Sequence, residues 1–302
     1  MREFIQRDRL KGFLLASFAG LLWSFGSLIV RYMVAAQSYQ WQYLFFRGLT
    51  IAMVLLIYIG AKDGIALIDR IKRIGLSGFL GACGLVAAFS GFIWSITLTT
   101  VANTLFMFAA APFIAAFLGI VLLKEKVRLL TWLTMAIALV GIFVMVLEGL
   151  EAGSLFGNLM ALVSAIGFAI FSVSLRWRKE TPKFTTVALG GVICALLTLV
   201  ILFLHQESLA MPSRNVYLSI LHGSIVGFGL ILFSMGAKFL PAAELALLSM
   251  MEVIGGVLWV YLPVFGIHEV PSTLTVVGGI ILFGAIVLDG VAARHQYSIR
   301  IN

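Results

Sequence analysis

Long apolar stretches separated by short polar links recur along the whole chain. A helix that crosses a bilayer needs about 20 predominantly apolar residues, and the stretches have about this length. Charged or turn-forming residues mark the links, as in the Lys-Glu-Lys run at 124–126. The pattern predicts ten spans, at residues 12–33, 43–61, 75–98, 101–123, 128–147, 155–176, 184–204, 217–238, 243–264 and 273–292.

The composition agrees with a chain that lies almost entirely in a bilayer. Of the 302 residues, 62% are hydrophobic and 11% are charged, whereas soluble domains are about half apolar and about a quarter charged. Six Pro and two Cys also exclude the compositions typical of disorder and of a disulfide scaffold. We therefore expect an all-α integral membrane protein without a soluble domain.

Lys and Arg are distributed unevenly between the two sides of the predicted spans. Of the 21, 18 lie on the side of the two termini, and three (Arg31, Arg47 and Arg214) lie on the other. Because cytoplasmic links carry an excess of Lys and Arg, we expect both termini in the cytoplasm and a multi-pass protein of the cell inner membrane. The net charge of +8 arises in these short links, so it does not indicate binding to nucleic acid.

The two halves of the chain are similar at an offset of about 141–145 residues. Matching positions are Gly12 with Gly157, Ser27 with Ser172, Arg31 with Arg176, Glu125 with Glu269 and Leu147 with Leu288. A first repeat at 1–147 and a second at 148–302 each contain five predicted spans, so the second repeat must be inverted. Inverted repeats are typical of secondary transporters, although two apolar sequences also align by chance in this way.

Several short motifs resemble those of EamA-type proteins in the drug/metabolite transporter superfamily. The motifs are Trp23-Ser-Phe-Gly-Ser27, Arg47 after Phe45-Phe46, Pro112 before Glu125, Met251-Glu252-Val253 and Glu269-Val-Pro-Ser. Val253 departs from the family pattern, which usually has Pro there. The resemblance covers the whole chain and implies a ten-span exporter of small metabolites, commonly amino acids, that does not hydrolyse ATP.

A carboxyl group is predicted near the middle of the ninth span. Glu252 lies nine residues after Ala243, about 14 Å along a helix, and a charged side chain at that depth costs roughly 3 kcal/mol. Ser249 and Trp259 share its helix face. Glu252 either binds a substrate amine or a proton, or hydrogen-bonds a neighbouring helix and holds the two together.

Polar and aromatic side chains also follow one face of the first and third predicted spans. Together with the ninth span they give the candidate substrate-binding residues, which are Trp23, Ser24, Ser27, Ser90, Trp94, Ser249, Glu252 and Trp259. Such a face either lines a cavity or lets helices pack closely through small residues.

Three further positions are candidates for a role in transport. Arg31 and Arg47 are expected at the outer mouth, where an Arg attracts a carboxylate or reaches lipid phosphates. Pro112 removes a backbone hydrogen bond in the fourth span, which predicts a hinge. The sequence contains no phosphate-binding loop and no paired catalytic residues within the spans, so we expect no enzyme, catalytic residue, metal or cofactor.

These features together predict a secondary transporter that works by alternating access. Its expected substrates are small amphipathic metabolites, amino acids first, and protons are a candidate coupling ion. The expected partners are the small-molecule substrate and the lipid bilayer, around a monomer or homodimer. A passive channel or facilitator, and transport of nucleotide-linked or cationic compounds, remain as alternatives.

Overall fold

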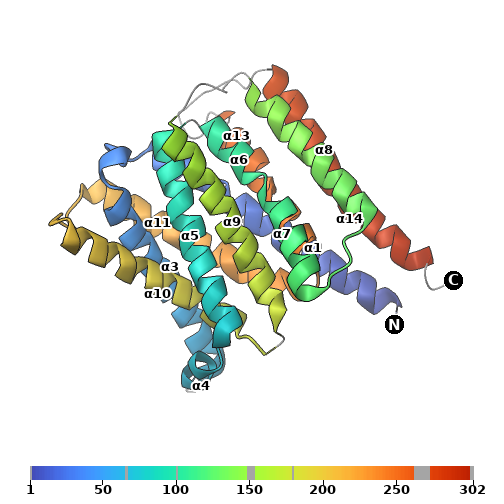
Figure 1. Cartoon of the computed structure of the whole chain (residues 1–302), viewed down its shortest axis with the longest axis horizontal. Helices are drawn as coiled ribbons and strands as arrows, with labels where there is room; N and C mark the ends of the chain where they lie inside the picture. Colours follow the sequence, from blue (N-terminus) through green and yellow to red (C-terminus); the bar gives the residue numbers. More distant parts are fainter. Residues whose placement is uncertain are drawn as a thin grey trace.

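Residues 2–64, 67–99, 101–147, 154–178, 180–261 and 273–299 are described by a computed structural model (Figure 1), and nearly all of them are helical. No β-strand occurs among these residues. The helices are α1 (Arg2–Trp23), α2 (Phe25–Arg31), η1 (Ala36–Ser38), α3 (Gln40–Asp63), α4 (Leu67–Lys72), α5 (Gly75–Leu98), α6 (Val101–Phe108), α7 (Ala111–Leu123), α8 (Leu129–Val146), α9 (Leu155–Trp177), α10 (Lys183–Leu204), α11 (Ser213–Gly236), α12 (Ala242–Ser249), α13 (Met251–Tyr261) and α14 (Thr273–Ile299).

Within the described ranges, seven helical stretches are long and apolar enough to cross a bilayer. They are Arg7–Arg31, Gln40–Lys62, Gly75–Leu98, Thr104–Leu123, Leu155–Trp177, Lys183–Leu204 and Ser213–Gly236. Shorter apolar helices lie at Leu129–Val144 and Val276–Asp289, where the fifth and tenth spans are predicted. The ninth predicted span is divided between α12 and α13. The fold is therefore that of an all-helical, multi-pass membrane protein.

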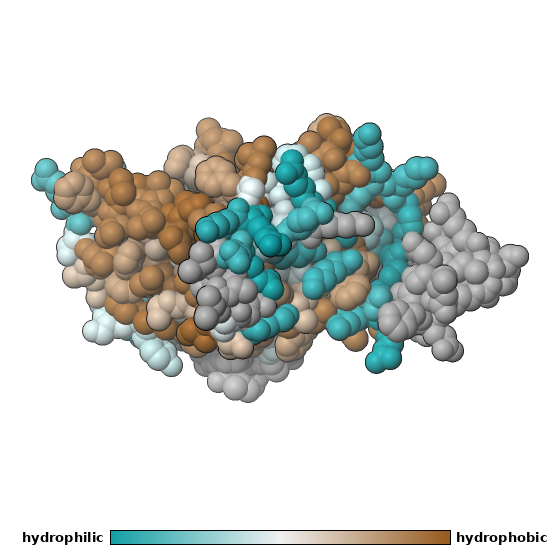
Figure 2. Space-filling view, turned by 90° about the horizontal axis from the view of Figure 1, so that it is seen from below, coloured by the Kyte–Doolittle hydropathy of each residue, from teal (hydrophilic) through white to brown (hydrophobic). Residues whose placement is uncertain are grey.

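Large apolar side chains cover much of the outer surface. Phe203 is 81% exposed, and Leu129 and Leu155 are also among the most exposed side chains. Figure 2 shows hydrophobic side chains over one broad area of the lower face and hydrophilic ones gathered in another. Contiguous apolar surface of this extent is unfavourable in water, and the hydrocarbon of a bilayer covers it.

Helices from the two halves of the chain alternate in space instead of forming two separate bundles. The most extensive packing joins α5 to α9, α3 to α10 and α8 to α14, and these pairs lie side by side (Figure 1). Gly84 and Gly167 bring α5 and α9 to backbone contact. A Cβ on Gly84 would lie 2.7 Å from the Gly167 carbonyl oxygen, and one on Gly167 would lie 2.6 Å from Ala88 N. Small residues allow this close packing in membranes.

Two of the predicted spans are interrupted by a short tight turn. The backbone N–H of Ala110, between α6 and α7, donates to Met107 O at 3.2 Å, and that of Met250, between α12 and α13, donates to Leu247 O at 3.1 Å. These bonds reach back three residues, as in a 3-10 helix, and such turns often mark hinges. Pro112 stands at the start of α7. The turn at Met250 has no Pro near it, and residue 253 is Val.

Candidate functional site

A cavity in the middle of the bundle is lined by residues of α1, α3, α5, α6, α9, α11 and α13. Its accessible volume is about 60 Å³, which is smaller than the range of about 300 to 1,000 Å³ of most ligand pockets. Its polar lining comes from four side chains, Arg47, Ser164, His222 and Glu252. Residues far apart in sequence thus meet at one site that includes both halves of the chain.

Arg47, on α3, places a guanidinium group in the wall of this cavity. The residue is only 5% exposed, and its Cζ atom lies 4.4 Å from the centroid of the Phe89 ring, a cation–π contact. Its Nε and Nη1 atoms are buried without a hydrogen-bond partner in the described structure. The sequence suggested a position at the outer mouth, and the structure instead places Arg47 inside the bundle.

Glu252 lies on the first turn of α13, two residues after the turn at Met250, and its side chain lines the same cavity. The charges of Glu252 and Arg47 interact electrostatically. Arg47 and Glu252 form no ion pair in the described part of the chain, so their charged groups are not in direct contact. The cavity therefore holds one acidic and one basic group, on two different helices, with space between them.

His222 and Tyr43 form a buried pair beside these charges. The Tyr43 hydroxyl lies 2.5 Å from His222 Nδ1, and Tyr43 lies one helical turn before Arg47 on α3. Gly26 makes room for the imidazole, because a Cβ there would lie 2.7 Å from His222 Nε2. The histidine is thus held by a hydrogen bond, and one side of it faces the cavity.

Aromatic rings form most of the remaining wall. Phe89, Phe92, Phe108, Phe168 and Trp23 all line the cavity. The Trp23 ring meets Phe168 edge to face at 5.7 Å between centroids, and its Nε1 donates to Val226 O at 3.4 Å. An apolar wall with a few fixed polar groups is typical of a small-molecule binding site.

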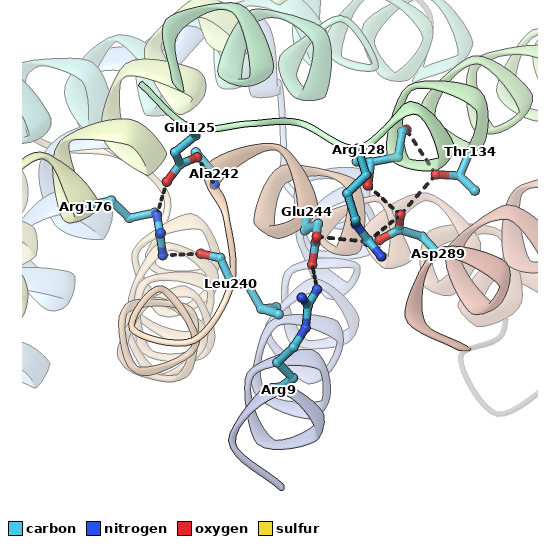
Figure 3. A network of polar contacts seen from close by, with 10 residues as sticks. Arg9, Glu125, Arg128, Thr134, Arg176, Leu240, Ala242, Glu244 and Asp289 are labelled. Atoms are coloured by element: carbon cyan, nitrogen blue, oxygen red, sulfur yellow. Dashed lines mark hydrogen bonds and ion pairs between the residues drawn. The ribbon is translucent and has the colours of Figure 1, made fainter. Parts of the chain in front are cut away.

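A network of charged side chains joins several helices at one end of the bundle (Figure 3). Glu244, at the start of α12, accepts hydrogen bonds from Arg9 at 2.5 Å and from Arg128 at 2.9 Å. Arg128 also donates to Asp289 of α14 at 3.2 Å, and Thr131 donates to the same oxygen at 2.9 Å. The network therefore links α1, α8, α12 and α14 across both halves.

A second group of the same figure centres on Arg176, at the end of α9. Its Nε donates to Glu125 at 2.5 Å, and its Nη1 donates to the carbonyl oxygens of Ala237 and Leu240. Glu125 in turn accepts from the Ala242 N–H at 3.1 Å. This group fixes the segment between α7 and α8 to the segment that leads into α12.

Sequence and structure comparisons agree with this architecture. Residues 10–147 match the EamA-like transporter family. That family is part of the drug/metabolite transporter superfamily. A solved crystal structure shares the fold, with a TM-score of 0.78 and 19% sequence identity over 95% of this chain and 99% of that chain. No curated protein matches the chain.

The family is one of membrane transporters of small solutes and is not enzymatic. The described residues also contain no cluster of three His, Cys, Asp or Glu side chains that could hold a metal ion.

Of the candidate residues named from the sequence, Trp23, Arg47 and Glu252 line the cavity. Ser24 and Trp259 are not among the lining residues but contact each other, since Trp259 Nε1 donates to Ser24 Oγ at 2.6 Å. The Trp259 ring stacks on Phe25 at 4.3 Å between centroids. These two residues therefore join α13 to the start of α2.

The other expected residues lie farther from the lining. Ser27 donates to Ser24 O at 3.3 Å, and Ser249 is fully buried and donates to Ala246 O at 2.7 Å. Ser90 is half-buried on α5, and Trp94 packs against Trp41 at 4.9 Å between ring centroids. The last two positions are Arg31, exposed at the end of α2, and Pro112, buried in α7. Glu269 lies outside the described residues.

Proposed function

We propose that this EamA-like protein is a secondary transporter that exports small amphipathic metabolites, with amino acids as its substrate class. The observation that carries the proposal is a half-buried carboxyl group that lines an aromatic cavity. Glu252 offers a partner for a substrate ammonium, and the rings of Phe92, Phe108 and Phe168 offer an apolar surface for the rest of the molecule. Burial of apolar area contributes about 25 cal/mol per Å², so both parts of such a substrate add to its affinity.

The proposal includes ten membrane spans arranged as two inverted repeats. α1 to α8 form five predicted spans and α9 to α14 form five more. In two such repeats, α1, α3 and α5 would correspond to α9, α10 and α11. The helix packing supports this correspondence. The contact of α1 with α11 corresponds to that of α9 with α5, and the contact of α3 with α11 corresponds to that of α10 with α5. The pairs α3–α10, α7–α12 and α8–α14 join equivalent spans of the two halves. The tight turns at Ala110 and Met250 also occur at equivalent positions.

Alternating access follows from this arrangement. In inverted-repeat transporters the substrate site lies between the repeats, and one end closes while the other opens. The cavity lies between helices of both halves, and the charged network of Arg9, Arg128, Glu244 and Asp289 holds helix ends together on the side of Arg9. The excess of Lys and Arg in the same links supports placing this side in the cytoplasm. We infer that the network closes the cytoplasmic end.

Transport by purified protein in lipid vesicles tests the proposal. Glu252→Gln keeps the size of the side chain but removes its charge and its proton. Because hydrogen bonds to charged groups contribute about 1.5–3 kcal/mol, amino-acid flux should fall about tenfold or more. Glu207→Gln is the matched control, since Glu207 is exposed between α10 and α11 and lies away from the cavity.

A counterflow measurement distinguishes a transporter from a channel. With alternating access, unlabelled amino acid on one side should accelerate entry of labelled amino acid from the other, whereas a passive channel gives no acceleration. Repeating the flux with and without a pH gradient identifies proton coupling. Wild-type flux in Glu252→Gln would contradict the proposed role of Glu252 and leave it as a structural contact between helices.

A further inference from the structure

Arg47 is buried and makes no ion pair with an acidic side chain among the described residues, unlike the half-buried Arg128. Arg128 also has buried Nε and Nη1 atoms without hydrogen-bond partners, but its Nη2 pairs with Glu244 and Asp289. Arg47 makes none of the ion pairs found among the described residues. A buried charge whose donors are unsatisfied is strongly unfavourable. Retaining such a group in a cavity wall indicates that a ligand supplies the missing acceptors.

The surroundings of Arg47 indicate the chemistry of that ligand. The titratable groups whose charges act on Arg47 are Tyr43, Cys194 and Glu252, of which only Glu252 is a carboxyl group. Phe89 lies against the guanidinium and fixes its plane. A guanidinium presents several N–H donors in a fixed planar arrangement that matches the two oxygens of a carboxylate. An anion that enters the cavity therefore finds donors that no protein carboxylate occupies.

Arg47 and Glu252 face one space without touching, and this separation suits a ligand with two charges. We propose that Arg47 binds the carboxylate of the substrate while Glu252 binds its ammonium group, so that the cavity selects zwitterions with an apolar or aromatic side chain. This inference rests on the proposed function and defines its substrate class more closely, because recognition of an amine alone does not distinguish amino acids from other amines. An ion of one sign would leave one of the two protein charges unpaired.

Three probes that differ by one charged group each test the inference. They are phenylalanine, its decarboxylated analogue phenethylamine and its deaminated analogue 3-phenylpropionate, and a matching set is built on leucine. Binding to the purified, detergent-solubilised full chain is measured by titration calorimetry. We expect each amino acid to bind at least about tenfold more tightly than either of its analogues, because each analogue leaves one protein charge unpaired.

Two variants separate recognition of the carboxylate from recognition of the amine. Arg47→Gln should weaken phenylalanine binding about tenfold or more and leave phenethylamine binding no weaker. Glu252→Gln should weaken phenylalanine binding similarly and leave 3-phenylpropionate binding no weaker. Arg47→Lys keeps the charge but loses the planar pair of donors, so its affinity for phenylalanine should fall between those of wild type and Arg47→Gln. Monodispersity and melting temperature establish that each variant is folded.

The outcomes separate this inference from the proposed function. If the wild type binds phenylalanine and phenethylamine equally, the role of Arg47 is overturned and export of amines still stands. If folded Arg47→Gln loses affinity for both probes to the same extent, Arg47 has a structural role and the inference fails. If none of the six probes binds to the wild type, the amino-acid class is overturned together with the inference.

Discussion

Arg176 donates from Nε to Glu125 at 2.5 Å, joining the end of α9 to the segment between α7 and α8. The repeat in the sequence singles out both residues, because Arg176 corresponds to Arg31 and Glu125 to Glu269. The pair is partly buried, with side chains 24% and 13% exposed. It therefore connects the end of α9, in the second half of the chain, to the segment that follows α7, in the first half.

Removing either charge of this pair should lower the stability of the protein. Arg176→Gln leaves Glu125 and the carbonyl oxygens of Ala237 and Leu240 with weaker donors. We expect a loss of roughly 1–3 kcal/mol, between the values of exposed and buried pairs, seen as a melting temperature lower by several degrees in detergent. Glu125→Gln should have a smaller effect, since fewer contacts depend on it. Equal melting temperatures for all three proteins would contradict this role.

The positions of most helices could be predicted from the sequence, because apolar runs interrupted by charges have few alternatives in a membrane. The ends of the second span were harder to predict. Gln40 and Gln42 look like link residues, yet they are buried in α3, where they donate to Thr97 Oγ1 and Ser208 O. The helix therefore begins earlier than the apolar pattern suggests. As a result, Arg47 lies about 10 Å from the start of the helix, well inside the bundle.

The contents of the cavity could be predicted only in part. Depth along a span identified Glu252, because a charge near the bilayer centre needs a specific environment. The sequence did not identify Phe89, Phe108 and Phe168 as lining residues. Their helices carry apolar residues on every face, so the spacing of these residues cannot show which face lines the cavity. The turn at Met250 has no Pro or Gly to mark it.

Weakening the charged network should open the end of the bundle that it joins. Glu244→Gln removes the carboxylate shared by Arg9 and Arg128, so the state open on that side should become more populated. Accessibility is measured in inside-out vesicles with Val226→Cys, a cavity position, after replacing Cys83 and Cys194. A membrane-impermeant thiol reagent should label this cysteine several-fold faster in Glu244→Gln.

The exposed Glu207 provides the control for that experiment. Glu207→Gln removes a charge of the same kind outside the network, in the link between α10 and α11. In this variant the Val226→Cys thiol should be labelled at the same rate as in the protein without either Gln substitution. Equal rates in all three proteins would show that the network does not control access from this side.

The proposed topology places Lys72 in the cytoplasm and Glu207 outside the cell. Both side chains are exposed, and single cysteines at these positions should be tolerated in a background without Cys83 and Cys194. In intact cells, an impermeant thiol reagent should label Glu207→Cys and should reach Lys72→Cys only after permeabilisation. The reverse pattern would invert the orientation, and labelling of both from outside would contradict the number of spans between them.

Close packing of α5 on α9 should be sensitive to a single added methyl group. In Gly84→Ala the new Cβ would lie 2.7 Å from the Gly167 carbonyl oxygen, so the helices must move apart, at a cost of roughly 1–3 kcal/mol. Gly60→Ala is the matched control, because a Cβ on Gly60 meets no atom within 4 Å and Ala favours the helix by up to about 1 kcal/mol. Melting in detergent should therefore shift down for Gly84→Ala and stay equal or rise for Gly60→Ala. Residues of both α5 and α9 line the cavity, so Gly84→Ala should also reduce flux. Equal melting and flux in the two variants would contradict backbone contact between these helices.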